Sequence, residues 1–226
     1  MSGYMFRQRC RPRGDFRIPQ IMEFLDVMKE AFRYSRLYDS HDKPVELTET
    51  GLRKILEKNV DKVFPSIGAT LDFFTIPPRK MDDDTVSFEI HTGTQPDEPF
   101  IDAYDISMDD KRKIPDFDYL ERSIQIFKPF EAFLSETENE YQLNAFNRQR
   151  AHPGFSKPAI IRGFHYLDEG MARSIGGSTY CLKAPAWHVK KFCDGVLFEL
   201  FPGPLDSDNP DHLEAQEGVV AYFNML

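Results

Sequence analysis

The stretch ATLDFFTIPPRKMDDDTVSFEIHTG, residues 69–93, decides the fold class of this 226-residue chain. Its first eight and last nine residues are rich in β-branched and aromatic side chains. In the last part Val86, Phe88 and Ile90 alternate with polar residues, which is the pattern of a half-buried strand. Prolines and three aspartates between the two parts supply turn chemistry. The stretch therefore predicts an antiparallel hairpin with a long, charged connection.

Helical spacing is found on both sides of this hairpin. Apolar residues recur at every third or fourth position in 18–38, in 48–64 and in 117–127. The stretch FEAFLSE (130–136) follows Pro129 and is expected to be a further short helical piece. A last helix is expected to begin after Asn209, a favoured capping residue that is followed by proline.

Further strands are expected at 101–106, 159–167, 178–184 and 195–201, of which GVLFELF (195–201) has the strongest pattern. Hairpins outnumber any βαβ alternation in this order of elements. The sequence thus predicts an α+β fold, with a mainly antiparallel sheet flanked by helices, in a single domain over residues 18–226.

Residues 1–17 carry five arginines against one aspartate and are expected to be a basic, flexible N-terminal segment. They lack the apolar core of a secretory signal, and no apolar run approaches the roughly 20 residues that cross a bilayer. The three cysteines are an odd number without CxxC spacing, as in reduced intracellular proteins. These features favour a cytoplasmic protein.

The formal net charge of −9 disfavours general binding to nucleic acid or to anionic membranes. Acidic residues gather in and after the hairpin, where a loop is free to face another protein. Such a group can speed encounter with a basic partner. The residues expected to face a partner protein are Asp82, Asp83, Asp84, Asp97, Glu98, Asp102 and Asp105.

No pattern in the sequence predicts a catalytic, cofactor-binding or metal-binding site. The six histidines form no HxxxH, HxH or HExxH motif, and the glycines do not have the spacing of a phosphate-binding loop. The protein is therefore expected not to be an enzyme. The alternative left open is a small hydrolase or transferase that uses His165, Asp168 and Cys181. A third reading is an adaptor module that self-associates.

The C-terminal third, DGVLFELFPGPLDSDNPDHLEAQEGVVAYFNML, resembles the end of the bacterial polymorphic-toxin immunity protein family 52. The family shows a GVLV-type strand, then a turn, then Asn-Pro, an acidic residue and a histidine that open the final helix. The matching residues here are Gly195, Val196, Leu197, Leu205, Asp206, Asn209, Pro210, Asp211, His212 and Leu213. The stretch HYLDEGMARSIGG (165–177) is similar to the family's Tyr-Leu and glycine-containing turn. A tryptophan that the family often has near the end of its first helix is absent.

This resemblance implies an immunity protein that binds and neutralises a cognate toxin as a stoichiometric, non-enzymatic inhibitor. The toxins that accompany the family are often nucleases with a restriction-endonuclease-like domain, in systems such as type VI secretion. The resemblance thus implies a toxin protein as partner, with no cofactor and no direct contact to nucleic acid or membrane. Whether the free protein is a monomer or a homodimer stays open.

Overall fold

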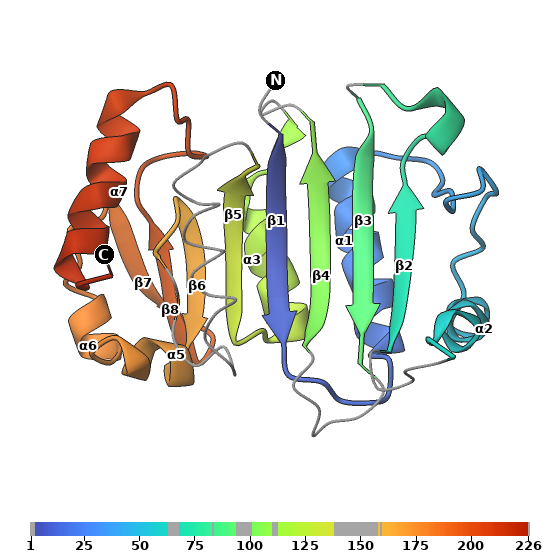
Figure 1. Cartoon of the computed structure of the whole chain (residues 1–226), viewed down its shortest axis with the longest axis horizontal. Coiled ribbons are helices and arrows are strands. Elements are labelled where there is room, and N and C mark those ends of the chain that lie inside the picture. The colour runs from blue at the N-terminus through green and yellow to red at the C-terminus, as the bar shows by residue number, and fades with distance from the viewer. Residues whose placement is uncertain are drawn as a thin grey trace. The chain divides into compact units, whose positions relative to one another are not determined.

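The computed structural model describes residues 3–62, 68–82, 84–93, 101–109, 113–137, 158 and 160–225. Two compact units are present. The first consists of Gln8–Lys128, and the second of Pro129–Leu226 together with Ser2–Arg7. The N-terminal strand β1 (Tyr4–Cys10) contributes its first residues to the second unit and its last residues to the first. Figure 1 labels the elements of both units.

The first unit contains the hairpin predicted from residues 69–93. Its strands follow the order β2-β3-β4-β1, and the β2–β3 and β3–β4 pairs are antiparallel. Phe88 in β3 lies opposite Phe73 in β2 and Ile106 in β4. The bounds of these elements are β2 (Ala69–Phe74), β3 (Val86–Thr92), β4 (Asp102–Met108), α1 (Ile18–Phe32), α2 (Glu49–Asn59), α3 (Phe117–Phe127) and the 3₁₀ turn η2 (Pro78–Lys80).

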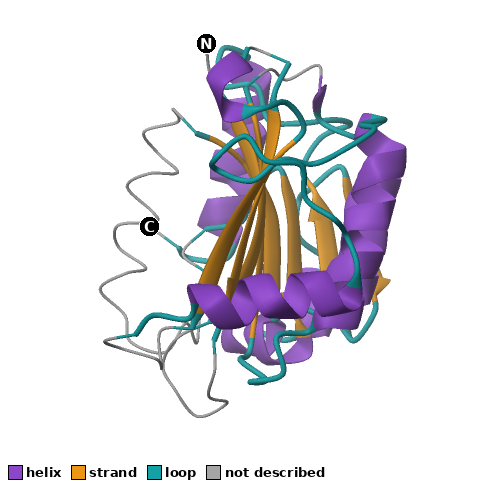
Figure 2. Ribbon diagram, turned by 90° about the vertical axis from the view of Figure 1, so that its right-hand side faces the viewer, coloured by secondary structure: helices purple, strands orange, loops and turns teal. Residues whose placement is uncertain are grey.

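Aromatic side chains hold α1 and α3 to these strands. The Phe24 ring of α1 lies 6.1 Å from Phe88 and 5.3 Å from Phe127, measured between centroids, and Phe127 stacks on Tyr104 of β4 at 3.7 Å. Such ring contacts add to the free energy gained from burying the apolar area. Both helices therefore lie on the same face of the strands of this unit, which Figures 1 and 2 show from two directions.

The second unit has the strand order β1-β5-β6-β8-β7, with antiparallel β5–β6, β6–β8 and β7–β8 pairs. Every residue of β5, β6 and β8 is buried, whereas every residue of β7 is exposed or half-buried. Its elements are β5 (Glu131–Glu136), β6 (Phe164–Asp168), β7 (His188–Phe192), β8 (Gly195–Glu199), α5 (Glu169–Ser174), α6 (Ser178–Cys181) and α7 (Pro210–Tyr222).

A reciprocal pair of tyrosines joins the short α6 to the end of α7. The Tyr180 hydroxyl donates to the backbone oxygen of Tyr222 at 2.9 Å, and the Tyr222 hydroxyl donates to that of Tyr180 at 3.2 Å. The two rings are stacked, with centroids 4.6 Å apart. Phe223 follows α7 and packs edge-on against Phe198 of β8. These contacts fix the end of α7 beside α6 and β8.

The structure confirms the predicted α+β class with a mainly antiparallel sheet flanked by helices, but several elements differ from the prediction, among them residues 131–136 and 178–181. Residues 131–136 form the strand β5 and not a helix, because a strand whose two faces are both buried loses the alternation that would identify it. Residues 178–181 form the helix α6 and not a strand. The preceding Gly176 and Gly177 have φ of 119° and 86°, a conformation that ends α5 and redirects the chain into a new turn.

The prediction of a flexible N-terminal segment is wrong for residues 4–10, because these residues form the strand β1. Tyr4, Phe6, Gln8 and Cys10 alternate along the strand and are buried. The Gln8 amide donates to the Ser123 hydroxyl of α3 at 2.6 Å. The arginines between these residues give the segment its basic composition, which hid the two-residue period of a strand.

Arg17 anchors the chain where β1 gives way to α1. Its Nε donates to Asp102 Oδ2 at 3.0 Å, its Nη2 to the Arg11 carbonyl at 2.7 Å, and its Nη1 to the Phe127 carbonyl at 3.4 Å. The Gly93 amide donates to the other Asp102 oxygen at 2.7 Å. Arg17 and Asp102 are 7% and 1% exposed, so they form a buried ion pair with both carboxylate oxygens engaged.

Replacing Asp102 by alanine is expected to destabilise the protein by about 3–5 kcal/mol, because the Arg17 charge stays buried without its counter-charge. The free energy of unfolding, measured by urea titration with circular dichroism, checks this. Glu30→Ala is the control: Glu30 pairs with Arg122 at 2.7 Å, but the two side chains are 59% and 47% exposed, so its loss should change stability by less than about 1 kcal/mol. Equal losses in the two variants would contradict the assigned role of Arg17 and Asp102.

Candidate protein-binding groove

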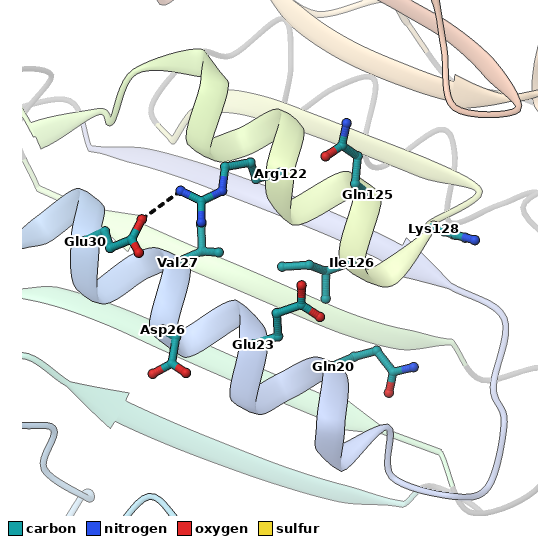
Figure 3. A pocket seen from close by; sticks show the side chains of 9 residues that line it. All are labelled: Gln20, Glu23, Asp26, Val27, Glu30, Arg122, Gln125, Ile126 and Lys128. Carbon is teal, nitrogen blue, oxygen red and sulfur yellow. Dashed lines mark hydrogen bonds and ion pairs between the residues drawn. The ribbon is translucent and has the colours of Figure 1, made fainter.

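A groove runs between α1 and α3 on the outer side of the first unit. Its volume is about 440 Å³, and Figure 3 shows the side chains that line it. The two helices are held apart by the packing of Phe24 and Phe127 beneath them. Val27 and Ile126 supply its apolar part, and polar or charged side chains supply the rest: Gln20, Glu23, Asp26, Glu30, Arg122, Gln125 and Lys128.

One end of the groove is closed by an ion pair. Arg122 Nη1 of α3 donates to Glu30 Oε2 of α1 at 2.7 Å. The hydrogen bond to Glu30 raises the pKa of the Arg122 guanidinium above its ordinary value. The Arg122 side chain also lies over the Tyr119 ring, 5.7 Å from its centroid. The charge of Arg122 is thus already balanced within the groove.

Two carboxylates of the groove are not balanced in this way. Glu23 and Asp26 are exposed, and neither forms an ion pair or hydrogen bond with any residue that the structure describes. In Figure 3 Glu23 lies between the two helices near Ile126, whereas the Asp26 side chain leaves α1 on the side turned away from α3. Lys128 follows the C-terminal end of α3. Carboxylates beside an apolar strip suit a segment that presents Lys or Arg next to an apolar side chain.

The sequence prediction missed this groove although its signal was present. The apolar stripe of α1 predicts which residues face the sheet, and it leaves Glu23, Asp26 and Glu30 on the opposite face. The prediction considered only acidic residues that are close together in the sequence and lie in or after the hairpin. In a helix, however, carboxylates that share a face are three or four positions apart.

The predicted partner-facing aspartates of the hairpin connection are partly described. Asp82 and Asp84 are exposed. The Asp82 carboxylate accepts a hydrogen bond from the Asp84 amide at 2.9 Å, and the Asp82 amide donates to the Thr85 hydroxyl at 3.1 Å. These bonds order the connection and leave both residues accessible. Asp83, Asp97 and Glu98 lie outside the described residues.

The other two predicted positions need correction, because Asp102 and Asp105 are 1% and 3% exposed. Both lie in β4, where Asp105 pairs in register with Glu89 of β3. Asp102 binds Arg17, as described above. Both residues were expected to face a partner, although they lie within the strand predicted at 101–106. Their burial removes them from any surface that a partner can contact.

The alternative Cys–His site also meets obstacles in the structure. His165 Nδ1 accepts from the Arg162 amide at 3.0 Å, so Nε2 carries the proton and faces Glu131 Oε1 at 3.1 Å. Both ring nitrogens are therefore occupied by groups other than a thiol. Cys181 lies 3.9 Å from the Ala172 carbonyl, and burial raises its pKa to about 11. Asp168 caps α5 by accepting from the Met171 amide at 2.7 Å. These three residues thus each have a structural role.

Metal-ligating clusters and membrane-spanning helices are both absent from the residues that the structure describes. No group of three or more His, Cys, Asp or Glu side chains gathers there in a way that could hold a metal ion. Within the same residues, no helix combines the length and the apolar character needed to span a bilayer.

The residues that carry the family resemblance build the turn before α7. The Asn209 side chain caps α7 by accepting from the Asp211 amide at 3.0 Å. His212 Nδ1 accepts from the Asp206 amide at 3.1 Å, and its ring stacks on Phe201 with centroids 4.0 Å apart. The motif therefore has a local structural purpose in this chain.

Comparisons with known proteins show a likeness in structure. No family model and no curated protein matches the chain, so the resemblance to immunity protein family 52 stays a prediction. Among solved structures, the chain is similar to "Pseudomonas aeruginosa T6SS protein PA0821", with a TM-score of 0.58 and 10% sequence identity. The match covers 96% of this chain and 72% of that one. At this identity the likeness shows a shared fold.

The environments of the three cysteines predict their reactivity. Burial raises the pKa of Cys10 to about 12 and that of Cys181 to about 11, whereas Cys193 is exposed. Only thiolates react, and at pH 8 the two buried thiols stay protonated because the pH lies far below their pKa values. A colorimetric thiol reagent at pH 8 should therefore titrate one thiol in the folded protein and three in denaturant. Rapid reaction of Cys181 in the folded protein would instead restore the Cys–His alternative.

Proposed function

We propose that this protein is an immunity protein, which binds a cognate bacterial toxin stoichiometrically and neutralises it without catalysis. The observation that carries the proposal is the α1–α3 groove, in which the exposed Glu23 and Asp26 stand beside an apolar strip without a hydrogen bond or ion pair to any described residue. Pockets for small molecules are mostly enclosed and apolar. An open groove between two helices, with charged rims, suits a protein segment better.

Two further observations support the proposal. The fold is shared with a protein described as a T6SS protein, which supports a role connected with that secretion system. The C-terminal residues that resemble the immunity family form an ordered turn and helix start. The groove lies in the first unit, whereas these residues lie in the second, so partner choice can vary in one unit while the other keeps its structure.

A nuclease is the toxin class that fits the charge of the chain. Nucleases bind phosphates through clustered Lys and Arg. An acidic protein of net charge −9 is attracted to such a cluster over distances up to the Debye length, which is about 8 Å in physiological salt. The groove carboxylates would then contact basic residues at the nuclease's phosphate-binding groove or its rim.

The test is co-expression of the chain with the protein that the adjacent gene encodes. Rescue of growth together with co-purification of a one-to-one complex is the expected result. Growth arrest without any complex would overturn the proposal. If instead rescue occurs while the toxin is chemically altered and no complex forms, the protein acts as an enzyme and the non-catalytic mechanism is wrong.

The double variant E23K/D26K should weaken this complex, with an association rate at low salt about tenfold below that of the wild type. The salt dependence of association should also flatten, because two attractive charges become repulsive. Stopped-flow or surface-plasmon measurements over a range of salt concentrations check both effects. E214K/E217K is the matched control, since Glu214 and Glu217 are exposed on α7 at the same spacing of three residues. An equal loss in both variants would mean that the two groove carboxylates act only through the net charge of the protein and do not contact the toxin.

A further inference from the structure

The two terminal strands of the sheet order differ in how their outer edges are covered. Beside β2, Tyr38 exchanges two hydrogen bonds of 2.9 Å with Phe74, and Val60 bridges to Ala69. Loop segments therefore cover both ends of the β2 edge. An exposed edge invites pairing with another chain, and covering it is one of the ways in which proteins prevent this.

The outer edge of β7 has no such cover. β7 pairs with β8 on one side, and no described residue forms a ladder or isolated bridge with its other side. In an edge strand the amide and carbonyl groups of alternate residues point away from the sheet. His188 and Lys191 are exposed, and the other three residues of β7 are half-buried. No residue in the described part of the chain therefore pairs with the edge anywhere along the strand.

The single tryptophan of the chain stands at the start of this edge. Trp187 directly precedes β7 and is 58% exposed, the largest value among the exposed large hydrophobic residues that the structure describes. Its ring lies edge-on to that of His188, with centroids 5.9 Å apart. Exposing an indole is unfavourable in water, and tryptophan is enriched at the energetic centres of protein interfaces. Trp187 thus offers an apolar anchor beside open backbone groups.

The charge of the edge indicates what it accepts. Lys190 and Lys191 are adjacent, so their side chains emerge on opposite faces of β7. Lys191 is exposed and has no ion-pair partner in the described part of the chain, whereas Lys190 lies 3.9 Å from Glu199. A strand added alongside β7 would place its side chains next to both lysines. Opposite charges at such cross-strand positions are stabilising, and like charges are destabilising.

The same charges disfavour a second copy of this chain as the occupant. In a symmetric antiparallel pairing centred on β7, Lys190 would face the identical lysine of the other copy. Lysines on an edge strand are a known means of preventing this kind of self-association. The occupant must therefore bring its own acidic residues.

We propose that the open β7 edge, with Trp187 at its start, binds an extended acidic segment of a partner protein by β-strand addition. The backbone of β7 supplies the hydrogen bonds, Lys190 and Lys191 select acidic side chains on the two faces, and Trp187 packs on an apolar side chain. This surface goes beyond the proposed toxin-binding role and does not depend on it. It belongs to the second unit, whereas the acidic groove belongs to the first.

Trp187 itself reports on occupancy, because the chain contains no other tryptophan. The probe is the capped peptide Thr-Val-Thr-Glu-Glu-Val-Thr, whose adjacent glutamates emerge on opposite faces as the two lysines do. Titration into the full chain should shift the fluorescence of Trp187 to shorter wavelength, saturably, and reduce its quenching by acrylamide. The absence of any shift at peptide concentrations of several millimolar would overturn the proposal.

Two control peptides test the mechanism of binding. A peptide with Lys-Lys in place of Glu-Glu should bind at least about tenfold more weakly, because both cross-strand pairs become repulsive. A peptide with proline in place of both valines should not bind, because it lacks the amide donors and cannot continue a ladder. An equal response to all three peptides would mean non-specific adsorption to the indole and would overturn strand addition.

Matched variants distinguish the effect of the two β7 lysines from the effect of the overall charge of the protein. K190E/K191E should lose affinity for the acidic peptide about tenfold and gain affinity for the Lys-Lys peptide. R53E/K54E, which changes two adjacent exposed residues of α2, should behave as the wild type. The gain for the Lys-Lys peptide cannot come from misfolding, so its absence would refute the role of the two lysines. If the emission wavelength of Trp187 changes with protein concentration in the absence of peptide, the edge mediates self-association instead.

Discussion

The placement of α1 beside α3 depends on the guanidinium of Arg17. It reaches the Asp102 carboxylate of β4, the backbone carbonyl of Arg11 after β1, and the carbonyl of Phe127 at the end of α3. A cation is favourable at a helix C-terminus, where carbonyls lack partners. One side chain therefore ties the start of α1 to the end of α3. The groove that we propose for partner binding therefore lies between two helices whose ends are joined by a buried contact.

The regions where the sequence predicted the fold well are those with a clear period. The alternation of Val86, Phe88 and Ile90 and the helical stripe that includes Phe24 both led to the observed elements. β5 was predicted as a helix because burial of both faces removes alternation, and β1 was missed because arginines dominate its composition. Local sequence could not predict these two strands, since their burial depends on segments distant in the chain.

The candidate site was less predictable than the fold. Among the seven acidic residues expected to face a partner, Asp82 and Asp84 are exposed, whereas Asp102 and Asp105 are buried. Composition alone does not distinguish a solvated carboxylate from one that neutralises a buried arginine, because the partner Arg17 is 85 positions away. The carboxylates of the groove come from a helix that the sequence predicted correctly. What was missing was the position of α3 opposite them.

The reciprocal tyrosines have a consequence for how the second unit opens. α6 has four residues, too few for a helix to persist in water without tertiary contacts. Its Tyr180 is held by Tyr222 at the last turn of α7, and Tyr222 is held in return. Neither helix end can fray without breaking the hydrogen bond that secures the other. The two ends therefore form one cooperative opening unit, whose backbone amides would exchange with solvent at a common rate.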